Sequence, residues 1–177
     1  AGLSFMSGAY WGNCLTQLFV NAMEREKVRY LLACDYDTVL TSGDVCRLYT
    51  IMENDPKIDA LAAIQCRREG ASILTNTGDR YERIEGTRVR IPMTDLAEET
   101  MPIFTSHFGC TLIRADSLRR APRPWFKQVH GEDGSEKGGG AMHEDIYFWH
   151  NWRECGNTIH QANRVVVGHM QLVVTWP

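Results

Sequence analysis

The sequence predicts an α/β fold in which a mixed, mostly parallel sheet is flanked by helices. Two short apolar runs of strand length, residues 30–34 and 60–66, stand on either side of a segment with helical periodicity at residues 42–54. A strand, a helix and a second strand in this order are typical of parallel strands joined by a crossover helix. The length of 177 residues, without a long linker or an internal repeat, predicts a single domain over residues 1–177.

Helices are predicted where apolar residues recur at intervals of three and four. The first is expected over residues 12–27 and the second over residues 42–54, where Pro56 follows the end of the pattern. A short helix is expected over residues 115–120. A further helix is expected from residue 143 to the glycine at position 156.

Further strands are predicted within residues 103–114, 158–169 and 171–175, where apolar runs return. Residues 67–100 are rich in Gly, Asn, Arg and Glu and predict an excursion made mostly of loops. Residues 127–141 contain several glycines, which is typical of a plain surface loop and also of a mobile lid over a site.

Composition limits the kinds of partner. Nineteen Lys and Arg against twenty-two Asp and Glu leave a formal net charge of -3, which does not indicate binding to nucleic acid or to an anionic membrane. No apolar run approaches the roughly 20 residues that span a bilayer, and the first ten residues lack the pattern of a signal peptide. We therefore expect a soluble, cytoplasmic protein without a transmembrane segment, either free or peripheral to a membrane.

The six cysteines contain no C-x-x-C pair, and several stand in apolar runs. This distribution favours reduced thiols in a cytosolic protein over a disulfide framework. They are Cys14, Cys34, Cys46, Cys66, Cys110 and Cys155.

The apolar run at residues 30–34 is followed by two carboxylates one residue apart, Asp35 and Asp37. Side chains two positions apart on an extended chain point to the same side, and two like charges there need a counter-charge. A divalent cation is one candidate, because Mg²⁺ and Mn²⁺ prefer hard oxygen ligands and a phosphate-bearing substrate can complete the shell. The alternative is a solvated turn after a strand.

Three further features fit the same chemistry, and each also has a plainer explanation. Glu144 and Asp145 stand at the start of a predicted helix, where carboxylates also interact favourably with the helix dipole by about 0.3 to 1 kcal/mol. His169 follows an apolar strand, where a packed or surface histidine is common. Arg67 and Arg68 follow another predicted strand, where they also fit a solvated pair.

Taken in order, these stretches resemble the nucleotide-sugar-dependent glycosyltransferases of the GT-A fold, particularly family 2 and its relatives. Residues 30–37 (YLLACDYD) are similar to the family's hydrophobic strand and Asp-x-Asp, residues 107–114 (HFGCTLIR) to a strand lining the acceptor side, and residues 143–156 to the acidic helix start that follows. His169 matches the place of a late histidine that many of these enzymes put on the metal. The resemblance covers about residues 12–170 and implies a GT-A-like, Rossmann-like sheet.

The resemblance implies transfer of a sugar from a nucleotide-sugar donor to an acceptor hydroxyl, with inversion of the sugar's configuration. A Mn²⁺ or Mg²⁺ ion held by Asp37, with help from Asp35 and His169, would neutralise the charge that builds on the departing nucleotide diphosphate. Asp35 alternatively faces the ribose. In an inverting reaction Asp145 is the candidate base that removes the acceptor's proton, with Glu144 as second choice. In a retaining enzyme that assignment fails.

The same resemblance suggests further donor and acceptor contacts. Together with the acidic pair, Arg67 and Arg68 are the expected donor-binding residues, because guanidinium groups form charge-assisted hydrogen bonds with phosphates. Trp125 or Trp149 would stack on a sugar or acceptor ring, although Trp149 fits a core position at least as well. The acceptor class stays open among a glycan, a lipid, a protein and a small molecule.

The start of the chain departs from the family pattern. The family usually has one or two strand–helix units ahead of its Asp-x-Asp, which form most of the nucleoside-binding surface, whereas only residues 1–34 precede it here. Three interpretations remain open. The chain is an N-terminally incomplete fragment, the missing unit is supplied elsewhere in a longer protein, or the nucleotide site is incomplete and activity is lost.

Two other classes of function fit parts of the sequence. Residues 34–41 resemble the first motif of haloacid-dehalogenase-like phosphatases, with Asp35 as nucleophile and Asp37 as general acid. That class also needs a lysine ahead of a later acidic pair, and no lysine after Asp37 stands convincingly in such a place. The other class is a non-catalytic domain that binds a carbohydrate or a partner on the same scaffold, which metal and nucleotide binding would distinguish.

Overall fold

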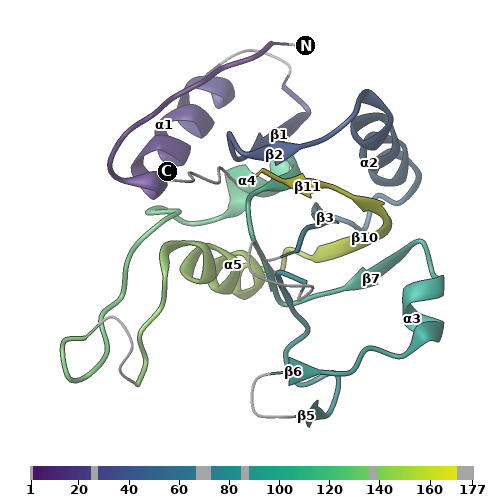
Figure 1. Ribbon diagram of the computed structural model, residues 1–177. Coiled ribbons are helices and arrows are strands. Elements are labelled where there is room, and N and C mark those ends of the chain that lie inside the picture. The colour runs from purple at the N-terminus through teal and green to yellow at the C-terminus, as the bar shows by residue number, and fades with distance from the viewer. Residues whose placement is uncertain (1, 25–27, 67–72, 85–87, 136–138, 171–177) are drawn as a thin grey trace, which may run out of the picture. The chain divides into compact units, whose positions relative to one another are not determined.

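The backbone of the computed structural model divides into two compact units (Figure 1). The single domain expected over residues 1–177 stays a prediction. Unit 1 comprises Ala1–Leu31 and Ile113–Asn157, and unit 2 comprises Leu32–Leu112 and Thr158–Pro177. The structure describes residues 2–24, 28–66, 73–84, 88–135 and 139–170.

Unit 1 contains helices that the apolar spacing of the sequence predicts. They are α1 (Trp11–Met23), α4 (Ala115–Arg120) and α5 (Glu144–Glu154). Helix α5 ends where Gly156 adopts a φ of +82°, a left-handed conformation that costs glycine little, and the N–H of Gly156 donates to the carbonyl of Arg153 at 2.9 Å. The predicted helix end at this glycine is therefore confirmed.

Aromatic side chains from α1, α5 and the segment between α4 and α5 form the core of unit 1. The rings of Phe126 and Phe148 stack with centroids 4.9 Å apart, and Phe148 meets Trp149 edge to face at 4.8 Å. Trp125 is 3% exposed and packs edge to face on Phe19. Since Trp125 and Trp149 are both buried, the structure supports the core position for each of them over stacking on a ligand ring.

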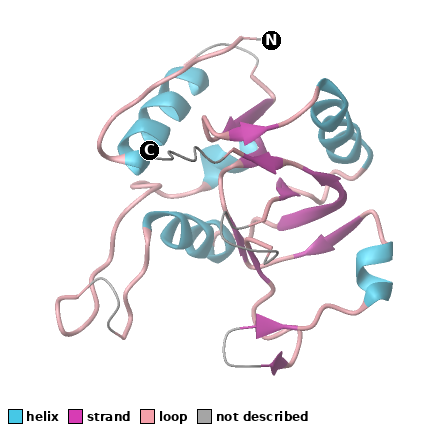
Figure 2. Cartoon of the chain, viewed as in Figure 1, coloured by secondary structure: helices cyan, strands magenta, loops and turns pink. Residues whose placement is uncertain are grey.

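The glycine-rich segment between α4 and α5 runs mostly without helix or strand, as Figure 2 shows. Its two ends are joined by a pair of hydrogen bonds between Val129 and Met142, each 2.9 Å long. Within it, the N–H of Gly134 donates to the carbonyl of Gly131, which makes a turn. The described part of this segment therefore forms a loop that its own backbone closes.

Unit 2 contains most of a five-stranded sheet in the order β1-β9-β3-β10-β7. Strand β3 is buried, and it pairs in parallel with β10, with Ala62 opposite Gln161. Helix α2 packs against both of these strands. The strands of this sheet are β1 (Tyr30–Cys34), β9 (Cys110–Arg114), β3 (Ala60–Ile64), β10 (Ile159–Val166) and β7 (Thr100–Pro102).

Short antiparallel pairs and two helices complete unit 2. Helix α2 begins with a capping box in which Thr41 and Asp44 each accept a backbone N–H of the other, which confirms the predicted helix start. The short pairs are β11 with β2, β4 with β8, and β5 with β6. The elements are β2 (Thr38–Val39), α2 (Ser42–Asn54), β4 (Thr75–Asn76), β5 (Arg83–Ile84), β6 (Arg88–Val89), α3 (Met93–Ala97), β8 (Thr105–Ser106) and β11 (Gly168–His169).

Strands β1 and β9 run antiparallel, as two backbone hydrogen bonds establish. The N–H of Ala115 donates to the carbonyl of Arg29 at 3.0 Å, and the N–H of Asp35 donates to the carbonyl of Gly109 at 3.2 Å. From the first bond to the second, the residue number rises by six on the β1 side, from Arg29 to Asp35, and falls by six on the β9 side, from Ala115 to Gly109. The two bonds therefore fix which residues face each other across the two strands.

The expected GT-A-like, Rossmann-like and mostly parallel sheet is wrong. Among the strand pairs whose register the structure describes, β10 with β3 is parallel, whereas β10 with β7, β11 with β2, β4 with β8 and β5 with β6 are antiparallel. Strand β9 lies between β1 and β3, so the predicted strand–helix–strand unit does not form a neighbouring parallel pair. An apolar run indicates that a strand is covered on both faces, but it does not determine the strand's neighbour or direction.

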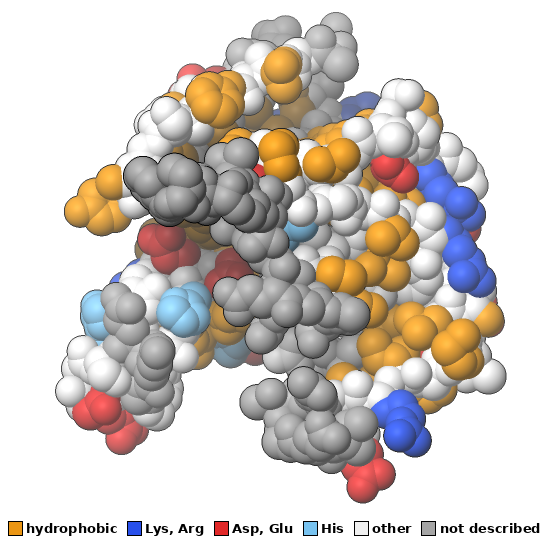
Figure 3. All heavy atoms as spheres, in the orientation of Figure 1, with side chains coloured by type: hydrophobic (Ala, Val, Ile, Leu, Met, Phe, Trp, Pro, Cys, Tyr) orange, Lys and Arg blue, Asp and Glu red, His pale blue; other side chains and the backbone are white. Residues whose placement is uncertain are grey.

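The surface carries both signs of charge together with exposed hydrophobic groups. Figure 3 shows orange hydrophobic side chains on the visible face among white, blue and red groups. Leu3, Phe5, Tyr36 and Met93 are among the most exposed large hydrophobic residues. In the described parts of the chain, no helix has the length and apolar character that a membrane span requires.

We expect the replacement Trp149→Ala to lower the free energy of unfolding by about 3 to 5 kcal/mol, because it removes a fully buried indole and leaves a cavity. Urea titration followed by circular dichroism measures this. The matched control in the same unit is Tyr10→Ala, since Tyr10 is 71% exposed, and its effect should stay within about 0.5 kcal/mol. Equal losses in the two variants would contradict the described core.

Candidate functional site

The strongest candidate site in unit 2 is the pair formed by Asp37 and His169. Asp37 stands in the turn between β1 and β2, and His169 ends β11, which pairs antiparallel with β2 so that His169 lies opposite Thr38. The N–H of Met170 donates to the carbonyl of Asp37 at 2.7 Å. This ladder brings Nε2 of His169 to 3.2 Å from Oδ2 of Asp37.

Because the Asp37 carboxylate is buried, it needs a polar contact such as the one with His169. Asp37 is only 5% exposed, and a buried carboxylate without a partner is strongly unfavourable. Nδ1 of His169 lies 3.2 Å from the carbonyl of Cys66, and because a carbonyl oxygen only accepts, Nδ1 carries a proton. Nε2 then either carries a second proton and forms an ion pair with Asp37, or presents a lone pair beside the carboxylate. The second arrangement needs a cation between the two groups or a proton on the carboxyl group.

The pair offers two side chains of types that could bind a divalent metal ion. Ligands at right angles around an ion with bonds of about 2.1 Å are about 3 Å apart, and the separation of Nε2 and Oδ2 is 3.2 Å. Mn²⁺ accepts both imidazole and carboxylate. No group of three or more His, Cys, Asp or Glu side chains that could hold a metal occurs in the described residues. Water or substrate oxygens would have to fill the remaining positions.

The structure brings Asp37 and His169 together but does not add Asp35 to them as a third ligand within the described residues. Asp35 lies directly after β1, where its N–H donates to the carbonyl of Gly109. Its predicted role toward a metal or a ribose stays a prediction. The predicted donor-binding residues Arg67 and Arg68 lie outside the described residues.

Buried polar groups beside the pair hold its strands together, and sequence reasoning missed them. Gln65, which is 2% exposed, donates to Oγ1 of Thr38 at 3.3 Å and to the carbonyl of Gly168 at 3.5 Å. Oγ1 of Thr38 donates in turn to the carbonyl of Gly109 at 2.6 Å. A Cβ atom on Gly109 would lie 2.3 Å from Oε1 of Gln65 and 2.6 Å from Nδ1 of His107, so a larger residue there would have to displace these side chains. A polar residue at the end of an apolar strand, as Gln65 is, was the available signal.

His107 adds a neutral imidazole to this region of unit 2. Its Nδ1 accepts the N–H of Gly109 at 2.8 Å. Burial, together with the neighbouring imidazole of His169, lowers the pKa of His107 to about 4. His107 is therefore uncharged at neutral pH and adds no positive charge beside His169.

Glu144 and Asp145 lie in the first turn of α5, in unit 1. Oε2 of Glu144 accepts the N–H of Gly12 at 2.9 Å, so it satisfies a free donor in the first turn of α1. Oδ1 of Asp145 accepts the N–H of Ile146 at 2.8 Å. The described contact of Glu144 is thus with the start of α1 and not with the start of its own helix, and the role of either carboxylate as a base stays a prediction.

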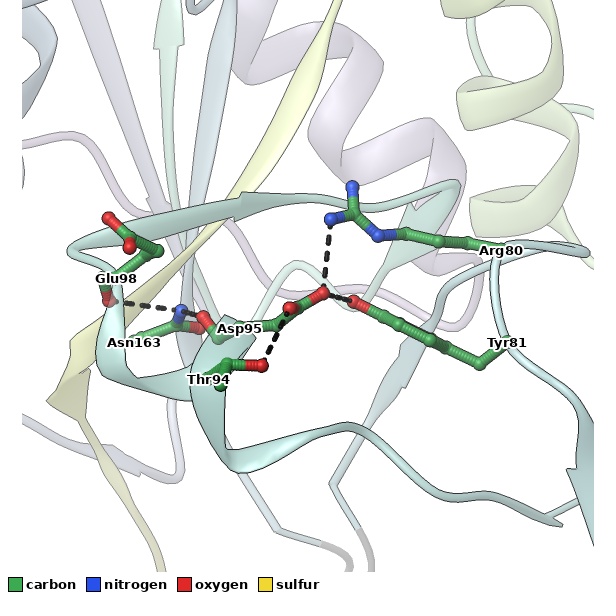
Figure 4. Close-up of polar contacts among 6 residues, drawn as sticks. All are labelled: Arg80, Tyr81, Thr94, Asp95, Glu98 and Asn163. Atoms are coloured by element: carbon green, nitrogen blue, oxygen red, sulfur yellow. Dashed lines mark hydrogen bonds and ion pairs between the residues drawn. The ribbon is translucent and has the colours of Figure 1, made fainter.

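A second polar cluster in unit 2 surrounds Asp95 in α3. Figure 4 shows Arg80 and Tyr81 pointing at the Asp95 carboxylate, which accepts from both, with Nη2 of Arg80 at 3.1 Å. The hydrogen bond from Tyr81 and then the one from Arg80 lower the pKa of Asp95. Nδ2 of Asn163 in β10 donates to the backbone carbonyl of Asp95 at 2.9 Å. These bonds fasten α3 and residues 80–81 to the sheet, and they account for the cluster as a structural anchor.

Unit 2 is thus a mixed-sheet α/β unit with a buried carboxylate–imidazole pair. No protein-family model and no curated protein matches the sequence. Among solved structures, the chain is similar to the crystal structure of A197 from STIV, with a TM-score of 0.63 and 13% sequence identity over 93% of this chain and 69% of that chain. At this identity the similarity shows a shared fold.

We expect the stability of unit 2 to fall as the pH drops from 6.5 toward about 4, because the unfolded chain protonates His107 in this window while the folded chain does not. Urea titrations across this range measure the slope. The replacement His107→Asn keeps an acceptor for the Gly109 N–H and should remove up to about 3 kcal/mol of the pH dependence.

The matched control for this replacement is His150→Asn, since His150 is an exposed residue of α5. Its slope should equal that of the wild type. An unchanged slope in His107→Asn would show that another group causes the acid sensitivity.

Proposed function

We propose that this chain is a metal-dependent glycosyltransferase that moves a sugar from a nucleotide-sugar donor to an acceptor hydroxyl, with inversion. The single observation that supports it most is the meeting of Asp37 and His169 at 3.2 Å in a buried place, although most of the chain separates them in sequence. The acidic pair and the late histidine are the residues that the resemblance assigns to the metal. The proposal concerns this chemistry and does not depend on a parallel sheet.

The residues have distinct roles under this proposal. Asp37 and His169 bind Mn²⁺ or Mg²⁺, and Asp35 faces the donor from the turn after β1. When bound, the ion supplies Lewis-acid stabilisation of the leaving diphosphate. Asp145 removes the proton of the acceptor hydroxyl, with Glu144 as the second candidate. Arg67 and Arg68 bind donor phosphates.

The environment of Asp37 favours a ligand role over the phosphatase alternative. A general acid in that alternative must reach the oxygen of a leaving group, whereas the Asp37 carboxylate is buried and directed at His169. All six cysteines are free, which suits a reducing compartment, and the proposal therefore includes a cytoplasmic location. The acceptor is a glycan, a lipid, a protein or a small molecule.

We expect Mn²⁺ together with a nucleoside diphosphate or its sugar to raise the melting temperature of the wild type by about 5 °C at 100 times the dissociation constant. The replacement Asp37→Asn should abolish this rise relative to its own baseline, because it removes the anionic ligand. Differential scanning fluorimetry with a panel of nucleotides, with and without metal, measures both. Asp79→Asn changes an exposed carboxylate of unit 2 and should respond as the wild type does.

Two outcomes would overturn this proposal. Turnover of a generic phosphate ester without any nucleotide response would favour the phosphatase. Neither turnover nor any response to metal and nucleotide would favour a non-catalytic binding domain.

We expect Asp145→Asn to lower the transfer rate by about 10² to 10⁴-fold while the donor's dissociation constant stays within twofold, since a general base acts on the acceptor's proton and does not hold the donor. Transfer of radiolabelled sugar and donor titration measure the two quantities. Asp116→Asn changes an exposed carboxylate of α4 and should keep full activity. An unchanged transfer rate in Asp145→Asn would assign the base to another residue.

A further inference from the structure

Cys34 of β1 and Cys110 of β9 lie directly opposite each other across neighbouring antiparallel strands of unit 2. The hydrogen bond from the N–H of Asp35 to the carbonyl of Gly109 makes the next pair along the strands Cys34 and Cys110. Hydrogen-bonded and non-hydrogen-bonded pairs alternate in such a ladder, so the two cysteines form a non-hydrogen-bonded pair, with Cα atoms about 4.5 Å apart. That separation falls within the range of about 4.4 to 6.8 Å that a disulfide spans.

The two thiols also contact each other through their side chains and differ in exposure. Cys34 is exposed to solvent, whereas Cys110 is 0% exposed. A hydrogen bond joins the two thiols. The thiolate is the reactive form of cysteine, and of the two sulfurs that of Cys34 is the one open to an oxidant in solvent. An accessible reactive thiol beside a second thiol is the arrangement found in reversible redox sites.

We propose that Cys34 and Cys110 form a reversible oxidation site, in which a hydroperoxide such as hydrogen peroxide closes a disulfide between β1 and β9. The Cys34 thiolate attacks one peroxide oxygen and the O–O bond breaks, which leaves Cys34 as a sulfenic acid and releases hydroxide. The Cys110 sulfur then attacks the Cys34 sulfur, the S–O bond breaks, and the S–S bond forms as water leaves.

The overall change is balanced in atoms and electrons. Two thiols lose two electrons and two protons, and one hydrogen peroxide takes them up to become two waters. A small dithiol reverses the change by thiol–disulfide exchange. This site is independent of the sugar-transfer chemistry, because neither cysteine contributes a ligand or a base to it.

The test oxidises the reduced full chain with hydrogen peroxide, alkylates the remaining thiols and maps the peptides without reduction. We expect a peptide in which Cys34 is joined to Cys110, a mass two hydrogen atoms lower than that of the reduced chain, and four alkylated cysteines out of the six that are free before oxidation. Treatment with a dithiol should restore six alkylated cysteines.

Single replacements distinguish the thiol that attacks the peroxide from the thiol that closes the disulfide. Cys34→Ser removes the exposed, attacking thiol and should abolish the joined peptide. Cys110→Ser should leave Cys34 as a sulfenic acid that a cyclic 1,3-diketone traps. The matched control is Cys46→Ser, because Cys46 is an exposed thiol of α2, and it should keep the joined peptide in full.

Two results would overturn the inference. One is full alkylation of all six cysteines in the oxidised wild type. The other is a joined peptide that pairs Cys34 or Cys110 with a different cysteine. Both are read in the wild type, so they do not depend on whether the buried Cys110→Ser variant folds.

Discussion

The burial of the Asp37 carboxylate is the constraint on which the arrangement at the end of unit 2 depends. A carboxylate that is 5% exposed needs a partner that is charged or donates a proton. After β10, the short strand β11 pairs with β2. This pairing places Nε2 of His169 3.2 Å from Oδ2 of Asp37. The carbonyl of Cys66 then fixes the imidazole by accepting from Nδ1. Three separate segments of the sequence therefore meet around this buried carboxylate.

Much of the local structure was predictable from the sequence, and the sheet was not. The helix ends at Thr41 and Gly156 follow from capping and left-handed glycine chemistry, which act within a few residues. Strand order depends on which distant segments share a core, and the apolar runs look alike whatever their direction. Nothing local shows that β9 inserts between β1 and β3, where Gly109 lies close to the side chain of Gln65.

The residue types alone did not bring the two halves of the site together. The resemblance to the glycosyltransferases implied that Asp37 and His169 would meet. Gln65 and His107 were missed, because their importance comes from burial next to that pair. The Asp95 cluster was hidden for a different reason: its partners come from a segment rich in glycine and charge, which by composition resembles solvated loop.

Because few protein side chains would hold the proposed metal ion, its binding would depend on the donor. Two side chains, Asp37 and His169, leave most of a six-coordinate shell to oxygens that the described residues do not provide. Phosphate oxygens of a donor are suitable ligands, so metal and donor would each raise the affinity for the other by the same factor. Either one alone would bind weakly, because the metal without phosphates keeps its water and the phosphates without metal face a buried carboxylate. A site of this composition would therefore bind the metal and a phosphate-bearing ligand cooperatively.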